Sequence, residues 1–419
     1  MRGFFVWLHR YVGLTLALFL ITEGATGSLM AFEADLTNLL DPTLVARRPS
    51  PQAQRLDLAT LAERAEALVP QAKFSYFIRV SDEQVFVRME ARDDPASGKP
   101  FEIDHEMIAL DPWTGDELGR YGVYKQGILA NVMPFVEQLH YNLALGERGL
   151  WITFVIALLW TIDCFVGFYL TFPLKLEKFW TRWKPAWLIK WRGGFYRVNF
   201  DLHRAGGLWF WAMLFVFAWS SVQLTDGSGL YESVMGKLFG FQPYNEELTA
   251  LHELPPRSET GPLKLDLRAA QTVGERLMAE LAQREGFKIE KPIALSRFEE
   301  SRQYNYSVRT DRRFPYDQNA SVFFDADTGA FQATLQTNRG RAGNTISNWL
   351  RALHMVENPV DYLAYRIFVV VVGLLIVMLS ATGVYVWWKK RKARVHASSR
   401  GAAVTAHSPQ AVDASAKGA

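Results

Sequence analysis

The chain has 419 residues, of which 49% are hydrophobic and 14% aromatic, and its formal net charge at pH 7 is +3. A single soluble domain rarely reaches this length, so we expect more than one folded unit, and so small a net charge gives no argument for nucleic-acid binding. Cys164 is the only cysteine, which excludes disulfides, Cys-rich zinc sites, iron–sulfur clusters and covalent c-type haem within one chain.

Four stretches, at about 11–32, 150–172, 205–225 and 364–388, are apolar and approach the roughly 20 residues that cross a bilayer. The first resembles a secretory signal around Ser28 to Ala31, but its apolar run is longer than a usual signal core, so we predict a retained helix. In the first half, the sequence predicts a transmembrane helix in 1–32, an outer module in 33–134, and a juxtamembrane helix followed by a second transmembrane helix in 135–172. A basic loop in 173–200 leads to the second half, with a third transmembrane helix in 201–225, a second outer module in 226–345, and a juxtamembrane helix followed by a fourth transmembrane helix in 346–392. A disordered tail is predicted in 393–419.

Basic residues near the ends of the apolar stretches predict the orientation. The loop 173–200 is rich in lysine and arginine, and the last stretch ends in Trp-Trp-Lys-Lys-Arg-Lys at 387–392. Because cytoplasmic loops carry an excess of such residues, both termini and this loop are predicted to be cytoplasmic. The two large segments then lie outside, which means the periplasm of an inner-membrane protein if the source is Gram-negative.

The two halves of the chain repeat each other. Leu56-Asp57-Leu58 and Leu265-Asp266-Leu267 each open a helical stretch that runs into segments with the alternation of strands. Asp111-Pro-Trp-Thr-Gly115 and Asp325-Ala-Asp-Thr-Gly329 then suit tight turns, and they lie 214 positions apart. Val166-Gly-Phe-Tyr169 and Thr382-Gly-Val-Tyr385 align at an offset of 216. The predicted fold class is therefore a membrane α-helical protein whose four transmembrane helices are duplicated, with two outer α+β modules.

Four of the eight histidines follow the same duplication. Leu8-His9-Arg10 reappears as Leu202-His203-Arg204, and Leu139-His140 reappears as Leu353-His354. His9 and His203 begin spans on the inner side, whereas His140 and His354 precede spans on the outer side. The remaining histidines have no repeat partner and are expected to be structural or solvated: His105, His252, His396 and His407.

One histidine from each half on each side of the membrane predicts a pair of ligands on each side. Two axial imidazoles per iron give six-coordinate, non-covalent haem b, which favours electron transfer over oxygen chemistry. Zinc is a weaker interpretation because it takes three or four protein ligands, and an ordinary polar residue at a membrane edge is the alternative for each histidine taken alone. We therefore predict two haem b groups, held by His9 with His203 and by His140 with His354.

Other polar residues near the apolar stretches are secondary candidates. Arginines beside the histidines could pair with haem propionates or simply extend toward the lipid headgroups: Arg10, Arg204, Arg148 and Arg351. Glu23 and Asp163 lie inside spans, at a cost of about 2.5–3.5 kcal/mol each. They are candidates for admitting protons or electrons, for a quinol contact, or for a hydrogen bond between helices. No Gly-rich nucleotide loop follows a strand, so flavin or NAD(P)H binding is not supported.

The N-terminal W-L-H-R-x-x-G-L, the D-x-x-T-G of both modules and the closing G-x-Y followed by basic residues resemble the PepSY-associated transmembrane family, over roughly residues 1–392. Within it, the chain is similar to inner-membrane siderophore-iron reductases that carry two haems. The resemblance implies PepSY-like modules and a haem-dependent oxidoreductase that takes electrons from an unknown donor, a quinol or a cytoplasmic reductase, to a periplasmic ferric siderophore. A haem relay to another periplasmic acceptor and a haem-free PepSY regulator or anchor remain alternatives.

Overall fold

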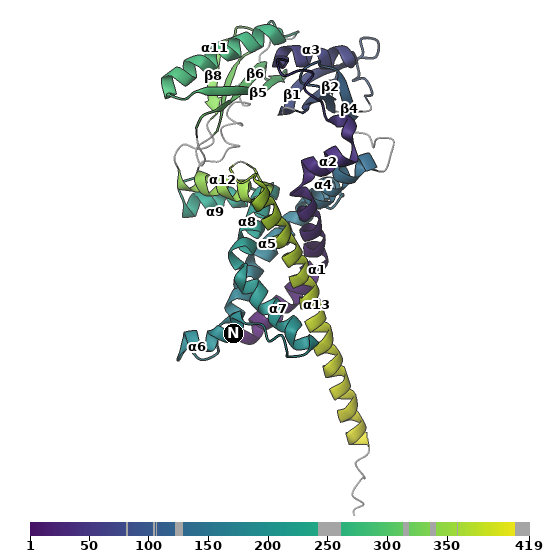
Figure 1. Ribbon diagram of the computed structural model, residues 1–419, viewed down its shortest axis with the longest axis vertical. Coiled ribbons are helices and arrows are strands. Elements are labelled where there is room, and N and C mark those ends of the chain that lie inside the picture. Colours follow the sequence, from purple (N-terminus) through teal and green to yellow (C-terminus); the bar gives the residue numbers. More distant parts are fainter. Residues whose placement is uncertain are drawn as a thin grey trace, which may run out of the picture. The chain divides into compact units, whose positions relative to one another are not determined.

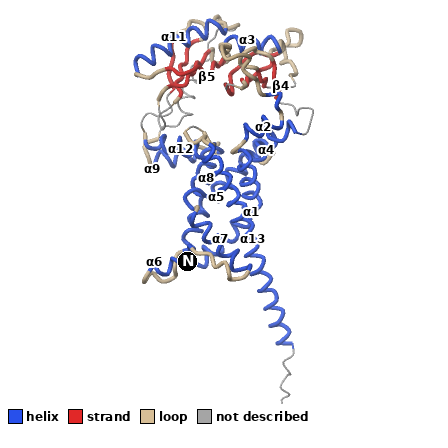
Figure 2. Tube along the Cα trace, in the orientation of Figure 1, coloured by secondary structure: helices blue, strands red, loops and turns tan. Residues whose placement is uncertain are grey.

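The computed structural model divides the chain into two compact units, which we describe separately. The first comprises Met1–Ser28, Ile152–Trp219 and Ile367–Ala419, and the second comprises Leu29–Trp151 and Ser220–Arg366. The structure describes residues 1–80, 83–103, 105, 107–121, 129–241, 261–312, 318–335, 341–357 and 359–406. Helices, strands and loops are distinguished in Figure 2.

The first unit is built from long apolar helices and the segment between two of them. Three helices of the described chain are long and apolar enough to cross a membrane, and a bent pair of helices makes a fourth if it is counted as one span. The helices that form this unit, wholly or in large part, are α1 (Arg2–Met30), α5 (Gly146–Thr171), α6 (Phe179–Trp183), η3 (Lys184–Trp187), α7 (Phe195–Trp209), α8 (Trp211–Thr225) and α13 (Leu363–Ala406).

The third predicted span differs most from its expectation. We expected one helix over 201–225, but α7 begins at Phe195 and the chain bends by 70° between α7 and α8, at Phe210. Gly206 and Gly207 lie just before the bend, and consecutive glycines weaken a helix because they lack side chains that restrict the backbone. Gly206 also packs closely on α13, where an added Cβ would lie 3.3 Å from Met378.

The last helix also differs from its expectation. α13 continues to Ala406, although a disordered tail was expected from residue 393. Alanine, arginine and lysine, which are common between 390 and 406, are good helix formers. Residues 407–419 lie outside the described residues.

The second unit contains the shorter helices and all the described strands. Its helices are α2 (Glu33–Leu40), η1 (Pro42–Leu44), α3 (Leu58–Leu68), η2 (Leu129–Asn131), α4 (Val132–Asn142), α9 (Leu230–Leu238), α11 (Leu267–Glu285) and α12 (Ala342–Met355). Both predicted juxtamembrane stretches are helical, as α4 and α12. Gly149 lets the chain turn tightly between α4 and α5, because a Cβ there would overlap the carbonyl of Asn142.

The strands of both modules form one antiparallel sheet, in the order β4-β3-β2-β1-β5-β6-β7-β8. Their bounds are β1 (Ala72–Val80), β2 (Val85–Ala91), β3 (Met107–Leu110), β4 (Glu117–Tyr121), β5 (Ile289–Phe298), β6 (Gln303–Thr310), β7 (Asn319–Asp325) and β8 (Phe331–Leu335). Each half therefore supplies a helix and a four-stranded meander. The halves join where β1 pairs with β5, with Tyr76 opposite Ser296. Two outer modules were expected, and the structure shows that they share a sheet.

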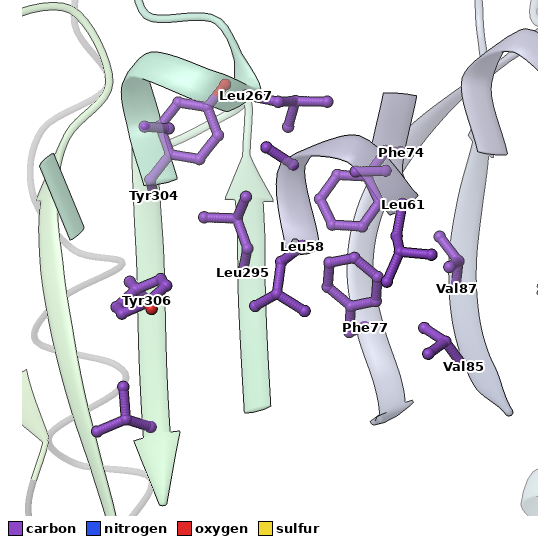
Figure 3. Packing of buried hydrophobic residues seen from close by; sticks show 14 of the residues in the cluster. Leu58, Leu61, Phe74, Phe77, Val85, Val87, Leu267, Leu295, Tyr304 and Tyr306 are labelled. Carbon is purple, nitrogen blue, oxygen red and sulfur yellow. The ribbon is translucent and has the colours of Figure 1, made fainter. Parts of the chain in front are cut away.

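The helices α3 and α11 lie on one face of this sheet and close a shared hydrophobic core (Figure 1). Figure 3 shows Leu58 and Leu61 of α3 beside Phe74 of β1, and the same core continues to Tyr304 of β6. Burying a large apolar side chain contributes about 1.5–3 kcal/mol. The Asp in each repeated Leu-Asp-Leu caps its helix, since the Asp57 carboxylate accepts from Thr60 N at 2.8 Å and that of Asp266 from Ala269 N at 2.8 Å.

The repeated D-x-x-T-G motif forms a turn in each half, as expected. Oδ1 of Asp111 accepts hydrogen bonds from Trp113 N and Thr114 N, and Oδ1 of Asp325 accepts from Asp327 N and Thr328 N. The final glycines, at positions 115 and 329, have φ values of +73° and +68°, where a side chain would be strained. These motifs therefore shape the fold and are not chemical sites.

Candidate functional site

The first unit brings His9 and His203 together, although 194 positions separate them in the sequence. His9 lies on α1 and His203 on α7, and their ring centroids are 6.0 Å apart with 52° between the ring planes. The two residues come from equivalent positions of the two halves. The pairing expected from the repeated Leu-His-Arg motif is therefore present in the structure.

The second unit brings His140 and His354 together. His140 lies in the last turn of α4 and His354 in the last turn of α12, and their ring centroids are 6.3 Å apart. Burial, and secondarily the neighbouring His140, lowers the pKa of His354 to about 3. At neutral pH the His354 ring is therefore uncharged, which is the form that binds metals.

The separation within each pair fits a metal ion between the rings. Two metal–nitrogen bonds of about 2 Å, with about 1.1 Å more from each nitrogen to its ring centroid, place the centroids of opposed ligands about 6 Å apart. The observed values are 6.0 Å and 6.3 Å. Two imidazoles are the protein ligands of six-coordinate haem iron, so the residues present fit that group.

The rings of His9, His203 and His354 each have a hydrogen-bond partner at Nδ1. The carboxylate of Asp163 lies 2.9 Å from Nδ1 of His9, and the backbone oxygen of Leu379 lies 2.9 Å from Nδ1 of His203. Nδ1 of His354 lies 2.7 Å from Oγ of Ser220. Metal-binding histidines usually donate the hydrogen of one ring nitrogen to such a partner and coordinate through the other. With Nδ1 engaged in this way, Nε2 is the nitrogen that would coordinate a bound metal.

Two glycines lie against the rings of the first pair. A Cβ at Gly167 would meet Cε1 of His9 at 3.4 Å, and one at Gly383 would meet Cε1 of His203 at 3.1 Å. Both are the glycines of the repeated G-x-Y motif, on α5 and α13. The same motif thus makes room for a histidine ring in each half.

The profile of the family described as PepSY-associated TM region matches residues 6–390. The chain belongs to the PepSY-associated transmembrane family. The resemblance inferred from the sequence is thereby confirmed, and the match together with the apolar helices shows a multi-pass membrane protein. The comparison with curated proteins finds no match for the chain.

The acidic residues of the spans have different surroundings in this PepSY-associated protein. Asp163 on α5 forms a hydrogen bond with a ring on α1, which is one of the three roles expected for it. Glu23 is half-buried on α1 beside Gly24, and a role in admitting protons or electrons stays a prediction. The contribution of Ser220 was missed from the sequence. The sequence offers one signal for it: Ser220 is a hydroxyl residue within the predicted span 201–225, which begins beside the repeated His203.

The arginines proposed for propionates have varied partners. Arg204 donates to the Asp201 carboxylate and to the Pro185 carbonyl, both at 2.7 Å. Arg351 forms a bidentate ion pair with Glu357. Arg10 is half-buried and Arg148 is exposed. The propionate role stays a prediction for all four residues.

Two of the four histidines without a repeat partner, His105 and His396, are among the described residues. His105 is buried, with 4% of its surface exposed. His252 and His407 lie outside the described residues, and His396 lies on the part of α13 whose side chains are not described. Over the described ranges, no group of three or more His, Cys, Asp and Glu side chains could hold a metal ion.

Proposed function

We propose that this protein is an inner-membrane di-haem oxidoreductase that transfers electrons to a periplasmic ferric siderophore and so releases its iron. The observation that carries the proposal is the pairing of four repeat-related histidines, with ring centroids 6.0 Å apart for His9 and His203 and 6.3 Å apart for His140 and His354. Each pair takes one ligand from each half of the duplication. A chance placement of polar residues at membrane edges would not pair the halves in this way.

In this proposal the four imidazoles hold two haem b groups without covalent attachment. With two histidines holding each iron, the bound haems would supply reversible one-electron chemistry rather than oxygen activation. The partners at Nδ1 fix the orientation of the rings: Asp163 for His9, Leu379 O for His203 and Ser220 for His354. Removing such a partner from a metal-binding histidine costs about 10–100-fold in metal affinity or activity.

The chemistry of iron release supports a ferric chelate as the electron acceptor. Siderophores hold iron through hard oxygen ligands, which suit Fe(III) better than the softer Fe(II). One electron, delivered to Fe(III) in the chelate, gives Fe(II) and weakens the complex. The basic loop 173–200 and the basic end of α13 favour a cytoplasmic position for both termini, so the siderophore would be met on the periplasmic side. The electron donor would be a quinol or a cytoplasmic reductase.

The absorption spectrum and haem content of the purified protein test the cofactor. We expect a Soret band, split bands in the reduced state and two haems per chain. His140→Ala and His354→Ala should each lose one haem and keep the other, whereas His407→Ala should keep both. A wild-type protein without a Soret band would show a haem-free regulator or anchor instead.

Reoxidation of the reduced protein tests the substrate. Dithionite-reduced protein, freed of excess reductant, is mixed with ferric hydroxamate, ferric catecholate and ferric citrate, and the decay of the reduced bands is followed together with Fe(II) capture by ferrozine. We expect at least one ferric siderophore to oxidise the protein with an equal yield of Fe(II). If none does while a periplasmic redox protein does, the protein is a relay to that acceptor.

A further inference from the structure

The two halves of the protein differ in chemistry at one equivalent position beside the first histidine pair. The offset of 216 that relates Gly167 to Gly383 also relates Asp163 on α5 to Leu379 on α13. Asp163 reaches Nδ1 of its histidine with both carboxylate oxygens, at 2.9 Å and 3.0 Å. Leu379 reaches Nδ1 of the other histidine with its backbone oxygen, at 2.9 Å. The same place in the duplicated fold therefore carries an anion in one half and a neutral carbonyl in the other.

The location of the Asp163 carboxylate increases its electrostatic effect on the His9 ring. The side chain of Asp163 is 13% exposed, and its partner His9 lies on a helix long and apolar enough to span a membrane. A charge in such surroundings is poorly screened, and its burial within a span costs about 2.5–3.5 kcal/mol unless it is paired. The repeat shows that a carbonyl suffices to orient the equivalent histidine. Orientation of the ring alone therefore does not require a carboxylate.

A carboxylate that accepts the Nδ1 hydrogen makes the imidazole more basic and a stronger electron donor through Nε2. A stronger donor stabilises ferric iron relative to ferrous iron and so lowers the reduction potential, for which second-shell hydrogen bonding is one of the protein's controls. A neutral carbonyl, as at His203, has a weaker effect, and so does the Ser220 hydroxyl that lies 2.7 Å from Nδ1 of His354.

We propose that Asp163 is a positioning residue that makes His9 a strongly donating ligand and thereby lowers the reduction potential of the haem iron held by His9 and His203. The inference rests on the proposed function, because it needs haem at this pair. A low potential at this haem favours transfer of its electron toward the acceptor. There, one electron converts ferric iron to ferrous iron. The role belongs to the carboxylate charge, since the geometry alone is reproduced at the other ligand by a backbone oxygen.

The test compares Asp163→Asn with wild type in a His140→Ala background, so that the only remaining haem is that of His9 and His203. Asparagine keeps an oxygen that accepts from Nδ1 but loses the charge. The midpoint potential is measured by spectroelectrochemistry at one fixed pH, and haem content and the low-temperature EPR spectrum of the ferric state are recorded. We expect the ratio of ferrous to ferric haem at a given potential to rise at least tenfold in Asp163→Asn, which is about 59 mV for a one-electron couple. The EPR spectrum of its ferric haem should shift toward that of a haem with a less basic imidazole ligand.

A matched control lies at the other ligand of the same pair. The hydroxyl of Thr382 is 3.3 Å from Nδ1 of His203, while the carbonyl of Leu379 stays in place. Thr382→Val should therefore change the ratio of ferrous to ferric haem at a given potential by less than about threefold. A role for Asp163 in packing alone would change the stability of Asp163→Asn without raising its potential.

Each outcome decides the inference. Full haem content with an unchanged potential in Asp163→Asn overturns it and leaves the proposed function intact. If Asp163→Asn binds no haem, Asp163→Glu and Asp163→Gln repeat the comparison at equal side-chain length, and equal potentials in that pair overturn the inference. Absence of haem from the wild-type protein overturns the proposed function itself.

Discussion

A Cβ atom at Gly383 would lie 3.1 Å from Cε1 of His203. So short a contact can be relieved only if the histidine ring or α13 moves. The ring is held by the Leu379 carbonyl on α13 itself. The position of the His203 ring therefore depends on the absence of a side chain one turn further along the same helix.

Gly383→Ala is expected to lower haem occupancy of the His9 and His203 pair and to destabilise the protein by about 1–3 kcal/mol through overpacking. Gly167→Ala should have a smaller effect, since its Cβ would meet His9 at an ordinary contact distance of 3.4 Å. Haem per chain and the thermal midpoint of the detergent-purified protein measure both effects. Gly13→Ala is the control, because a Cβ there would meet no neighbouring atom of the described residues within 4 Å. Equal haem content in Gly383→Ala and Gly13→Ala would contradict the prediction.

Gly24→Ala is expected to separate α1 from α13. An added Cβ would lie 2.6 Å from the backbone oxygen of Gly373, and backbone cannot yield as a flexible side chain does. Small residues at helix crossings in membranes allow this close approach. We expect a loss of about 1–3 kcal/mol, measured as a lower thermal midpoint. Gly13→Ala, on the same helix with no atom within 4 Å, should be neutral or slightly stabilising, and the idea fails if the two variants behave alike.

Ser220→Ala is expected to weaken haem binding at the His140 and His354 pair about tenfold, because it removes the oxygen that lies 2.7 Å from Nδ1 of His354. Ser220 is fully buried, so water is not expected to replace the hydroxyl readily. Transfer of haem to apomyoglobin, followed over time, reports the loss. Ser221→Ala removes the neighbouring hydroxyl as a control and should transfer haem at the wild-type rate. A wild-type rate for Ser220→Ala would show that the hydroxyl does not hold the ring.

Acidification is expected to weaken the second module through Asp327. Its hydrogen bond to Arg302 is the main cause that lowers the pKa of this carboxyl from 3.8 to about 2. A carboxyl whose pKa is lower in the folded state than in the unfolded state stabilises the fold at pH values above the unfolded-state pKa. This stabilisation disappears as the pH falls from 3.8 toward 2. The first module has Trp113 at the equivalent position and lacks this pair.

Asp327→Asn should therefore cost about 3 kcal/mol at neutral pH, as expected when one partner of a buried ion pair is removed. Thermal midpoints measured between pH 7 and pH 2.5 should converge for wild type and variant as the pH falls. Glu357→Gln breaks the exposed pair with Arg351 and should cost no more than about 1 kcal/mol. A gap between wild type and Asp327→Asn that stays constant down to pH 2.5 would argue against the ion pair as its cause.

Much of the fold follows from local patterns. Apolar length predicts the membrane helices, and the Asp of each Leu-Asp-Leu caps a helix because the capping hydrogen bonds involve residues only three positions away. The bend at Phe210 was not predicted, although Gly206 and Gly207 precede it. Glycines are tolerated in straight membrane helices too, so their presence alone does not decide between a bend and a continuous span.

The joining of the two modules could not be predicted either. Tyr76 pairs with Ser296 across the β1–β5 boundary, but strand alternation specifies which face of a strand is buried and not which strand lies next to it. The same limit applies to Asp163. The sequence shows a costly carboxylate in a span, whereas its alignment with His9 depends on how α1 and α5 are rotated about their axes.

By itself, the sequence determined the duplication, the apolar helices, the family and the four histidines that repeat, because these are properties of spacing and composition. Only the tertiary structure decided that His9 meets His203 and that His140 meets His354 at ring separations near 6 Å. It also decided that a carboxylate lies at Nδ1 of His9 where a backbone carbonyl lies at Nδ1 of His203. Those relationships join residues more than a hundred positions apart, and they depend on the packing of helices whose rotation no local pattern specifies.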